Sequence, residues 1–263
     1  MKSLKLIHIT RYCRYFYYKS VKHHSKRPTF ITRAAVLLSA CFIAQIITTP
    51  NALASGAYSI ACVETKAVGH APIPVPVPTL NPQVSLSQII LHTNCGDITI
   101  DTSKQNAPLA KTSFIQLASH GYFDITLCHR LTTSGIFVLQ CGDPTATGSG
   151  GPNWSFGDEN LPPNKPNNYP AGTLAMANSG PSTNGSQFFL VYSDTSLPPN
   201  YTIWGQVTSG LDVIKYIAAQ GVRSGGSDGS PIPVAINSTE LFYQDTATPT
   251  PTAPKKSPHN PDS

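Results

Sequence analysis

The chain has 263 residues, of which only 12% are charged, with 18 lysines and arginines against 13 aspartates and glutamates. Nine of the 18 basic residues lie before position 34 and no acidic residue precedes Glu64, so the remainder, with 9 basic and 13 acidic residues, carries a net charge of −4. This distribution argues against a basic domain that binds nucleic acid, and the length allows one domain with extensions or two small domains.

The N-terminal region has the order of an export or anchoring signal. Residues 1–33 form a basic lead, and residues 34–54 form an apolar run that ends in small residues. This order is typical of a secretory signal peptide with cleavage after Ala54. An uncleaved membrane anchor is the alternative, because extending the apolar run to Leu53 makes a weak span, and a lipoprotein box at Leu38–Cys41 is a third interpretation. We expect the lead to stay in the cytoplasm and the rest of the chain to be extracytoplasmic, either secreted or anchored to the cell membrane.

Residues 55–84 are expected to form a proline-rich extracytoplasmic linker. Proline occupies positions 72, 74, 76, 78 and 82, and alternating proline favours an extended, semi-rigid spacer. Residues 246–263 contain no aromatic residue, and their composition predicts a disordered tail. Between the linker and the tail we expect one domain, over residues 85–245.

Within this domain the sequence predicts a hairpin, two helices and many short strands. The hairpin covers residues 88–102, with its turn at residues 94–97. One helix opens at Ala107-Pro108 and stops at Gly121, and a second covers residues 211–219. The residues expected to share one face of the first helix are Leu109, Phe114, Ile115, Leu117 and Ala118. Two short helices and about eight strands predict an all-β domain, a closed β-barrel capped by the helices.

Two of the six cysteines lie before residue 55. The other four, Cys62, Cys95, Cys128 and Cys141, fall in the part expected to be exported, where disulfides can form. The sequence contains no Cys-x-x-Cys pair, so a zinc or thioredoxin-type site has no support. Buried free thiols are the alternative to disulfides.

Motifs of several common enzyme classes are absent. Residues 148–153 lack the third glycine of a dinucleotide loop, and the sequence has no Gly-Lys-Ser/Thr, His-Glu-x-x-His or Gly-x-Ser-x-Gly. We therefore expect neither a cofactor nor a metal ion. Arg130 is a better candidate for chemistry: apart from Arg223 it is the only arginine after Arg33, and it lies in strand-like sequence opposite aromatic and aliphatic residues. A strand-edge arginine paired with a carboxylate is the structural alternative.

Several blocks of sequence resemble the cyclophilin family in order and spacing. The blocks are Phe123-Asp124, Cys128-His129-Arg130, Gln140-Cys141-Gly142-Asp143-Pro144, Gly148-Ser149-Gly150-Gly151, Phe156-Gly157-Asp158-Glu159, residues 172–181 and Thr183-Asn184-Gly185-Ser186-Gln187-Phe188-Phe189. The resemblance extends from about Ile89 to Ile236 and looks most like extracytoplasmic actinobacterial cyclophilins. It implies an eight-stranded antiparallel barrel closed by two helices, and peptidyl-prolyl cis-trans isomerase activity on proline-containing polypeptides.

The resemblance also implies roles for individual residues. The catalytic arginine falls on Arg130, and Gln140 and Asn178 are implied to take part in catalysis by holding the substrate backbone. The residues implied to bind substrate are His129, Phe137, Val138, Ala177, Gln187, Phe189, Leu197 and Tyr201. Four of them, Phe137, Val138, Phe189 and Leu197, are implied to form the floor of a proline pocket.

Five positions depart from the family pattern. Cys128 and Cys141 replace a phenylalanine and a glycine on strands that are neighbours in the family fold, which implies a disulfide between them; two buried thiols are the alternative. Val138 and Tyr201 replace a methionine and a histidine, which we expect to change substrate preference without removing activity. Ser196 replaces a tryptophan, and we expect weak cyclosporin binding for that reason.

The implied chemistry needs few components. Rotation about an Xaa-Pro bond crosses a barrier of ~18–20 kcal/mol because the amide resonance must be broken. A guanidinium can donate a hydrogen bond to the prolyl nitrogen as it becomes pyramidal, while an apolar pocket holds the ring. We expect a monomeric isomerase that assists the folding of exported proteins. The alternative is a non-catalytic proline-binding module or holdase that uses the same pocket.

Overall fold

The computed structural model describes residues 59–80 and 85–244. The predictions for residues 1–54, for the ends of the linker and for the C-terminal tail lie outside the described residues. In the two described ranges, no helix is both long and apolar enough to cross a membrane.

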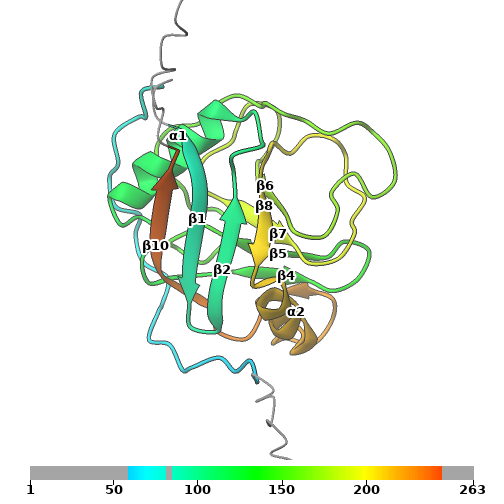
Figure 1. Ribbon diagram of the computed structural model, residues 1–263. Helices are drawn as coiled ribbons and strands as arrows, with labels where there is room; N and C mark the ends of the chain where they lie inside the picture. The colour runs from blue at the N-terminus through cyan, green and yellow to red at the C-terminus, as the bar shows by residue number, and fades with distance from the viewer. Residues whose placement is uncertain (1–58, 81–84, 245–263) are drawn as a thin grey trace, which may run out of the picture. The chain divides into compact units, whose positions relative to one another are not determined.

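Ten strands form one antiparallel sheet in the part of the chain that the structure describes (Figure 1). In chain order the elements are β1 (Leu86–Thr93), β2 (Gly96–Asp101), α1 (Pro108–Ser119), β3 (Thr126–Leu127), β4 (Arg130–Thr132), β5 (Val138–Cys141), β6 (Thr173–Met176), β7 (Phe188–Val191), β8 (Ile203–Ser209), α2 (Leu211–Ala219), β9 (Asp228–Gly229) and β10 (Ala235–Tyr243). The order in the sheet is β3-β10-β1-β2-β8-β6-β7-β5-β4-β9. The prediction of an all-β fold with two short helices is confirmed, and the strand count exceeds eight because β3 and β9 have two residues each.

Residues 126–132 pair with strands near both ends of the sheet. β3 pairs with β10, whereas β4 pairs with β5 and β9. Between them, the Cys128 amide donates to the Val234 carbonyl (2.9 Å) and the His129 amide donates to the Gln140 carbonyl (3.1 Å). His129 and Arg130 therefore lie where the chain changes partner from β10 to β5. Full closure of the ladder stays a prediction.

Strand β7 shows how the sequence builds two hydrophobic clusters. Its four residues are all apolar and buried. Because successive side chains point to opposite faces of a strand, Phe188 belongs to a large core with Trp204 and Phe114, whereas Phe189 belongs to a small cluster with Val138 and others. The small cluster forms the base of the site described below.

Helix α1 buries the predicted face with one exception, since Ile115 and Ala118 also pack against the core. Leu109 is exposed, and the buried residues are Ala110, Ser113, Phe114 and Leu117, a spacing typical of one face of a helix. The helix has Pro108 in its first turn but no side-chain cap of its own. Glu159 supplies one from a distant loop, since its Oε1 accepts from the Ala110 amide at 2.8 Å. In α2 the buried residues are Val213, Ile214 and Ile217.

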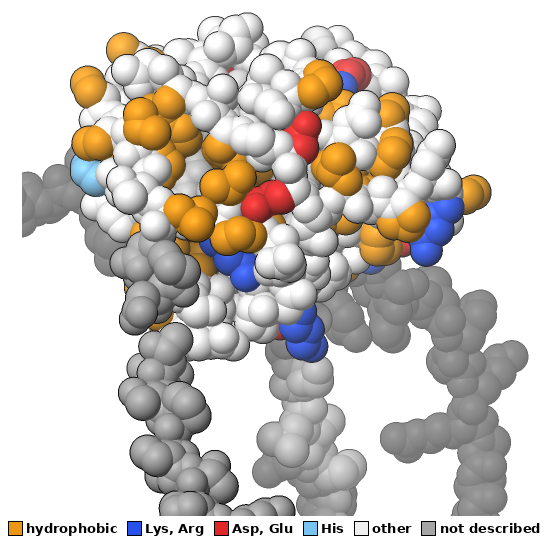
Figure 2. Space-filling model, turned by 90° about the horizontal axis from the view of Figure 1, so that it is seen from above, with side chains coloured by type: hydrophobic (Ala, Val, Ile, Leu, Met, Phe, Trp, Pro, Cys, Tyr) orange, Lys and Arg blue, Asp and Glu red, His pale blue; other side chains and the backbone are white. Residues whose placement is uncertain are grey.

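Charged side chains are few on the domain surface. On the face shown in Figure 2, hydrophobic and uncharged side chains predominate, and lysine and arginine do not form a continuous patch. This agrees with the low charge of the sequence outside the basic lead.

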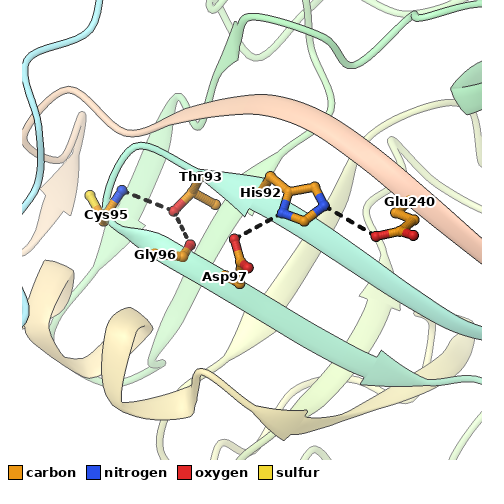
Figure 3. Close-up of polar contacts among 6 residues, drawn as sticks. All are labelled: His92, Thr93, Cys95, Gly96, Asp97 and Glu240. Carbon is orange, nitrogen blue, oxygen red and sulfur yellow. Dashed lines mark hydrogen bonds and ion pairs between the residues drawn. The ribbon is translucent and has the colours of Figure 1, made fainter.

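The β1–β2 hairpin carries a histidine between two carboxylates (Figure 3). His92 Nδ1 lies 2.9 Å from Asp97 Oδ1, and Nε2 lies 3.5 Å from Glu240 Oε2 on β10. In the adjoining turn, Thr93 Oγ1 donates to the Gly96 carbonyl and accepts from the Cys95 amide. The three strands are thus joined by side chains as well as by their ladders.

This arrangement predicts a pH dependence of stability. The hydrogen bond with Asp97 raises the pKa of His92 above its ordinary value. The stabilisation is therefore fully present below the unfolded pKa of about 6.5 and is lost as pH rises through the higher folded pKa. We expect His92→Gln to flatten the fall in the free energy of unfolding above about pH 6.5, measured by denaturant unfolding at several pH values. His120→Gln, at an exposed histidine after α1, is the control, and an equally steep fall in His92→Gln would contradict the assignment.

Candidate active site

A cavity of about 430 Å³ lies over the small hydrophobic cluster. Strands β4 and β5 supply one wall, the ends of β6 and β7 a second, and the segments around residues 146–148 and 228–230 form the rim. The lining residues are His129, Arg130, Ile136, Val138, Gln140, Ala146, Thr147, Gly148, Ala177, Asn178, Phe189, Leu197, Tyr201, Asp228, Gly229 and Ser230.

The base of the cavity is apolar. Phe189 and Tyr201 meet edge to face, with ring centroids 5.6 Å apart, and Val138 and Leu197 belong to the same cluster. Beneath them Tyr169 is fully buried, and its hydroxyl donates to the Tyr201 carbonyl at 3.1 Å. Burial raises the pKa of Tyr169 to about 12, so this phenol stays neutral and the base of the cavity carries no charge. The surface suits a small apolar ring.

Arg130 is held at the rim by a carboxylate. Its Nε and Nη2 donate to the two carboxylate oxygens of Asp228 at 2.8 and 2.7 Å, and its Nη1 donates to Gln140 Oε1 at 3.3 Å. The hydrogen bond with Asp228 raises the pKa of Arg130, and the same bond lowers the pKa of Asp228. Both side chains are partly exposed, so the pair contributes little to stability. Its two-point geometry instead fixes the orientation of the guanidinium.

Two glutamine side chains extend this network across the cavity. Gln140 Nε2 donates to Gln187 Oε1 at 2.8 Å, and Gln187 Nε2 donates to the carbonyls of Gly148 and Gly150. β5 pairs with both β4 and β7, which places Gln140 opposite Arg130 on one side and Phe189 on the other. These bonds connect the Gln140 side of Arg130 to the loop at residues 148–150, whereas the two shorter bonds to Asp228 hold the guanidinium independently of that loop.

Asp143 organises this loop from inside. The carboxylate is fully buried and accepts hydrogen bonds from the backbone amides of Thr145, Gly148 and Gly150, among others. Burial on its own would raise the pKa of Asp143, but the hydrogen bonds from Thr145 and the backbone amides outweigh it and lower the pKa. Position 150 requires glycine, because a Cβ there would collide with Asp143 Oδ1.

His129 lines the same cavity as a neutral imidazole. It is 8% exposed, and within the described residues neither ring nitrogen has a hydrogen-bond partner. Burial lowers the pKa of His129, so the ring is uncharged near pH 7. Arg130 is thus the one permanent cation among the residues that line the cavity.

The structure brings most of the predicted site residues together. Nine line the cavity: His129, Arg130, Val138, Gln140, Ala177, Asn178, Phe189, Leu197 and Tyr201. Gln187 lines an adjoining cavity of about 500 Å³ that shares Gln140, Gly148, Ala177 and Asn178 with the first. Asn178 is fixed by its own amide, which donates to the Asn200 carbonyl at 2.8 Å.

Phe137 is the one predicted catalytic or substrate-binding residue that is not among those lining either cavity. Its ring packs edge to face on Tyr192, with centroids 5.9 Å apart, against the large core. Adjacent residues of an extended chain point in opposite directions, which agrees with Val138 lining the cavity and Phe137 packing on the core. Ile136 lines the cavity instead.

Sequence reasoning offered a carboxylate partner for Arg130 as an alternative, and the structure shows one, but the sequence did not identify it as Asp228. It lies 98 residues from Arg130 in the chain, in the glycine- and serine-rich run 224–230. Its one visible signal is that it is the single acidic residue of that run. The pairing of β9 with β4 brings it to Arg130.

Cys128 and Cys141 are bonded to each other next to the Arg130–Gln140 pair. A second disulfide joins Cys62 to Cys95. The sequence implied the first pairing through the family resemblance and left the second open.

Two of the curated relatives that this chain matches come from mycobacteria. A protein of Mycobacterium tuberculosis (strain ATCC 25618 / H37Rv) named "Probable peptidyl-prolyl cis-trans isomerase B" is 48% identical over 166 residues, which cover 59% of this chain and 53% of the relative. A protein of the same name from Mycobacterium leprae (strain TN) is 48% identical over 177 residues, 63% of this chain and 59% of the relative. The match thus spans a little over half the length of these relatives.

Solved structures and a family model agree with these relatives. The crystal structure of a Cryptosporidium parvum cyclophilin type peptidyl-prolyl cis-trans isomerase superposes with a TM-score of 0.51 at 30% identity, covering 60% of this chain and 98% of the other. The family model described as "Cyclophilin type peptidyl-prolyl cis-trans isomerase/CLD" matches residues 88–241, more than half of the chain. The chain therefore belongs to the cyclophilin-type peptidyl-prolyl cis-trans isomerase family.

Proposed function

We propose that this domain accelerates rotation about Xaa-Pro bonds in polypeptides. The observation that carries the proposal is a guanidinium oriented by Asp228 and Gln140 at the rim of an apolar cavity. As the amide twists, the prolyl nitrogen becomes pyramidal and gains a lone pair, to which Arg130 donates a hydrogen bond. An acceleration of about 10⁵ corresponds to about 7 kcal/mol of stronger binding in the transition state, within reach of one charged donor and several fixed polar groups.

The cavity residues divide between ring and backbone. Val138, Phe189, Leu197 and Tyr201 hold the proline ring on an apolar surface. Gln140, Gln187, Asn178 and the Ala177 backbone bind the peptide on both sides of the ring. The neutral His129 closes the wall beside Arg130 without adding a second positive charge.

The full chain performs this reaction, in our proposal, on exported proteins outside the cytoplasm, secreted or anchored by residues 34–54. Two disulfides in the described residues fit an oxidising compartment. Protease treatment of intact cells that express the full chain, together with analysis of the medium, tests the location. The domain is expected in the medium or degraded on the cells, and a domain that stays with the cells and is protected until they are lysed would contradict it. Monomeric state and weak cyclosporin binding remain predictions.

A protease-free assay tests the activity. A peptide containing an Ala-Pro bond is transferred to conditions that change its cis population, and the relaxation is followed with increasing amounts of the full chain. We expect the relaxation rate to increase in proportion to protein concentration. An unchanged rate with a peptide that binds would instead identify a proline-binding module.

Asp228→Asn tests how Arg130 is positioned. The amide keeps the shape of the side chain but replaces one acceptor oxygen by a donor, so the two-point contact with Arg130 is lost. We expect kcat to fall about tenfold while KM changes less than about twofold, because the donor is misplaced but the cavity is intact. Asp212→Asn, at an exposed acid on α2, is the matched control, and Asp228→Glu should recover part of the loss. An unchanged kcat in Asp228→Asn would remove Asp228 from the account.

A further inference from the structure

Residues 59–80, which we call the N-terminal strap, lie outside the region that matches the family model and are attached to the domain (Figure 1, cyan). The strap has no helix or strand, as the alternating prolines predicted, but it does not stand away from the domain as a spacer would. Its first attachment is at the turn between β1 and β2. There Cys62 is bonded to Cys95, and Val63 exchanges hydrogen bonds with Asn94, both at 2.7 Å.

The second attachment is to the loop that borders the cavity. The His70 amide donates to the Pro144 carbonyl at 2.9 Å. Beside it Gly69 lies so close to the backbone of Thr145 that a Cβ at position 69 would collide with the Thr145 carbonyl oxygen. This packing leaves no room for any side chain other than hydrogen.

The third attachment is to the segment that follows this loop. Val75 is 5% exposed and belongs to the large core, and its carbonyl accepts a hydrogen bond from Trp154 Nε1 at 3.0 Å. Prolines at 74 and 76 flank it. Proline fixes its own backbone angle and restricts the residue before it, so this part of the strap loses little conformational entropy on docking.

The second and third attachments contact a segment, residues 144–155, that borders the two cavities in which substrate is proposed to bind. Residues 146–148 line the first cavity, and residues 148–155 line the second. Asp143 and Gln187 hold this rim from the inside. The strap holds it from the outside, at Pro144 and Trp154, within a few residues of the lining atoms.

We propose that the strap is a positioning element for the rim formed by residues 144–155, and that it sets the affinity for polypeptides long enough to contact the rim beyond the proline. This rests on the proposed function of the cavity. Short peptides that occupy the apolar base alone are affected little, since Arg130 and the base are held by β4, β5, β7 and Asp228. Longer substrates lose affinity when the strap is displaced.

Gly69→Ala in the full chain tests the proposal. The backbone of Gly69 is not left-handed, so alanine fits the strap itself and the collision with Thr145 is the main change. We expect KM for a ten-residue Xaa-Pro peptide to rise about tenfold with kcat unchanged within about twofold, and KM for a tetrapeptide to stay near wild type. Amide hydrogen exchange over residues 144–155 should increase in the same variant. Val68→Ala, at the exposed neighbouring residue, is the control and should behave as wild type.

The outcomes separate the strap from the isomerase activity. Wild-type KM and wild-type exchange in Gly69→Ala would overturn the proposal, and so would an equal loss for both peptides. If Gly69→Ala does not fold, Val75→Ala weakens the third attachment, where Val75 is buried in the large core. The same rise in KM for the longer peptide alone is expected, and wild-type kinetics would overturn the proposal. If the wild-type chain binds peptides without isomerising them, the proposed function fails, and the strap is still tested by the Kd of the long peptide and by hydrogen exchange.

Discussion

Arg130→Ala is expected to lower kcat/KM for an Xaa-Pro peptide by a factor of about 100 to 1,000, with the peptide Kd changed less than about threefold. The reason is that the guanidinium interacts with the prolyl nitrogen mainly when that nitrogen is pyramidal, in the transition state. The ground-state peptide is held by the apolar base and by Gln140, Gln187 and Asn178, which the substitution leaves in place. Kinetics and calorimetric binding on the same peptide separate the two effects.

Arg130→Lys separates the contribution of the positive charge from that of the fixed orientation of the guanidinium. Lysine keeps the charge but presents it as a point on a flexible chain, so it cannot donate to both oxygens of Asp228 and to Gln140 in one fixed geometry. We expect most of the activity to be lost in this variant too. Near wild-type activity in Arg130→Lys would mean that charge suffices and orientation does not matter, and more than half of wild-type activity in Arg130→Ala would contradict the catalytic role.

Cys128→Ala with Cys141→Ala is expected to lower the free energy of unfolding by about 3 kcal/mol, the loop-closure value for a bond between residues 13 apart. Alanine is used because serine would bury an unpartnered hydroxyl at these two buried positions. The bond also joins the strands that carry Arg130 and Gln140, so kcat should fall as their register loosens. Denaturant unfolding and steady-state kinetics measure the two effects.

The double variant Cys62→Ala with Cys95→Ala is the matched comparison. This bond joins residues 33 apart, for which the same reasoning gives a loss of about 3 to 4 kcal/mol. It fastens the strap and does not touch the strands of Arg130, so kcat for a short peptide should stay near wild type. If both double variants lose kcat equally, the effect of Cys128–Cys141 is general destabilisation and not alignment of the site.

Much of the fold could be predicted from local pattern. Alternation around the turn at residues 94–97 predicted the β1–β2 hairpin, and the glycines at 121 and 221 follow the ends of α1 and α2. The buried face of α1 followed from hydrophobicity only in part: Ala110 and Ser113 are small enough to lie against the core, whereas Leu109 points away. Which residues of α1 are buried depends on the side chains that pack against the helix, and these cannot be identified from the sequence of the helix alone.

The site was predictable where motifs are contiguous and not where the fold assembles distant segments. The resemblance placed nine residues around one cavity, but the contact of Arg130 with Asp228 depends on the pairing of β4 with β9. The contacts of the strap with the domain were likewise not predictable from the sequence. Its prolines predicted an extended chain, but its docking depends on Gly69 fitting against Thr145 and on Val75 reaching the core, neither of which is visible as a pattern.

The most direct test of the account is to measure binding and exchange of one peptide at once. Two-dimensional exchange NMR on an excess of an Ala-Pro peptide reports the cis–trans rate, and chemical-shift titration of the same samples reports the Kd. We predict that the wild-type chain gives exchange cross-peaks on the sub-second scale, far faster than the tens of seconds or more of the free peptide, and that Arg130→Ala binds the peptide without them. Binding by the wild-type chain without cross-peaks, or cross-peaks of equal strength in Arg130→Ala, would contradict it.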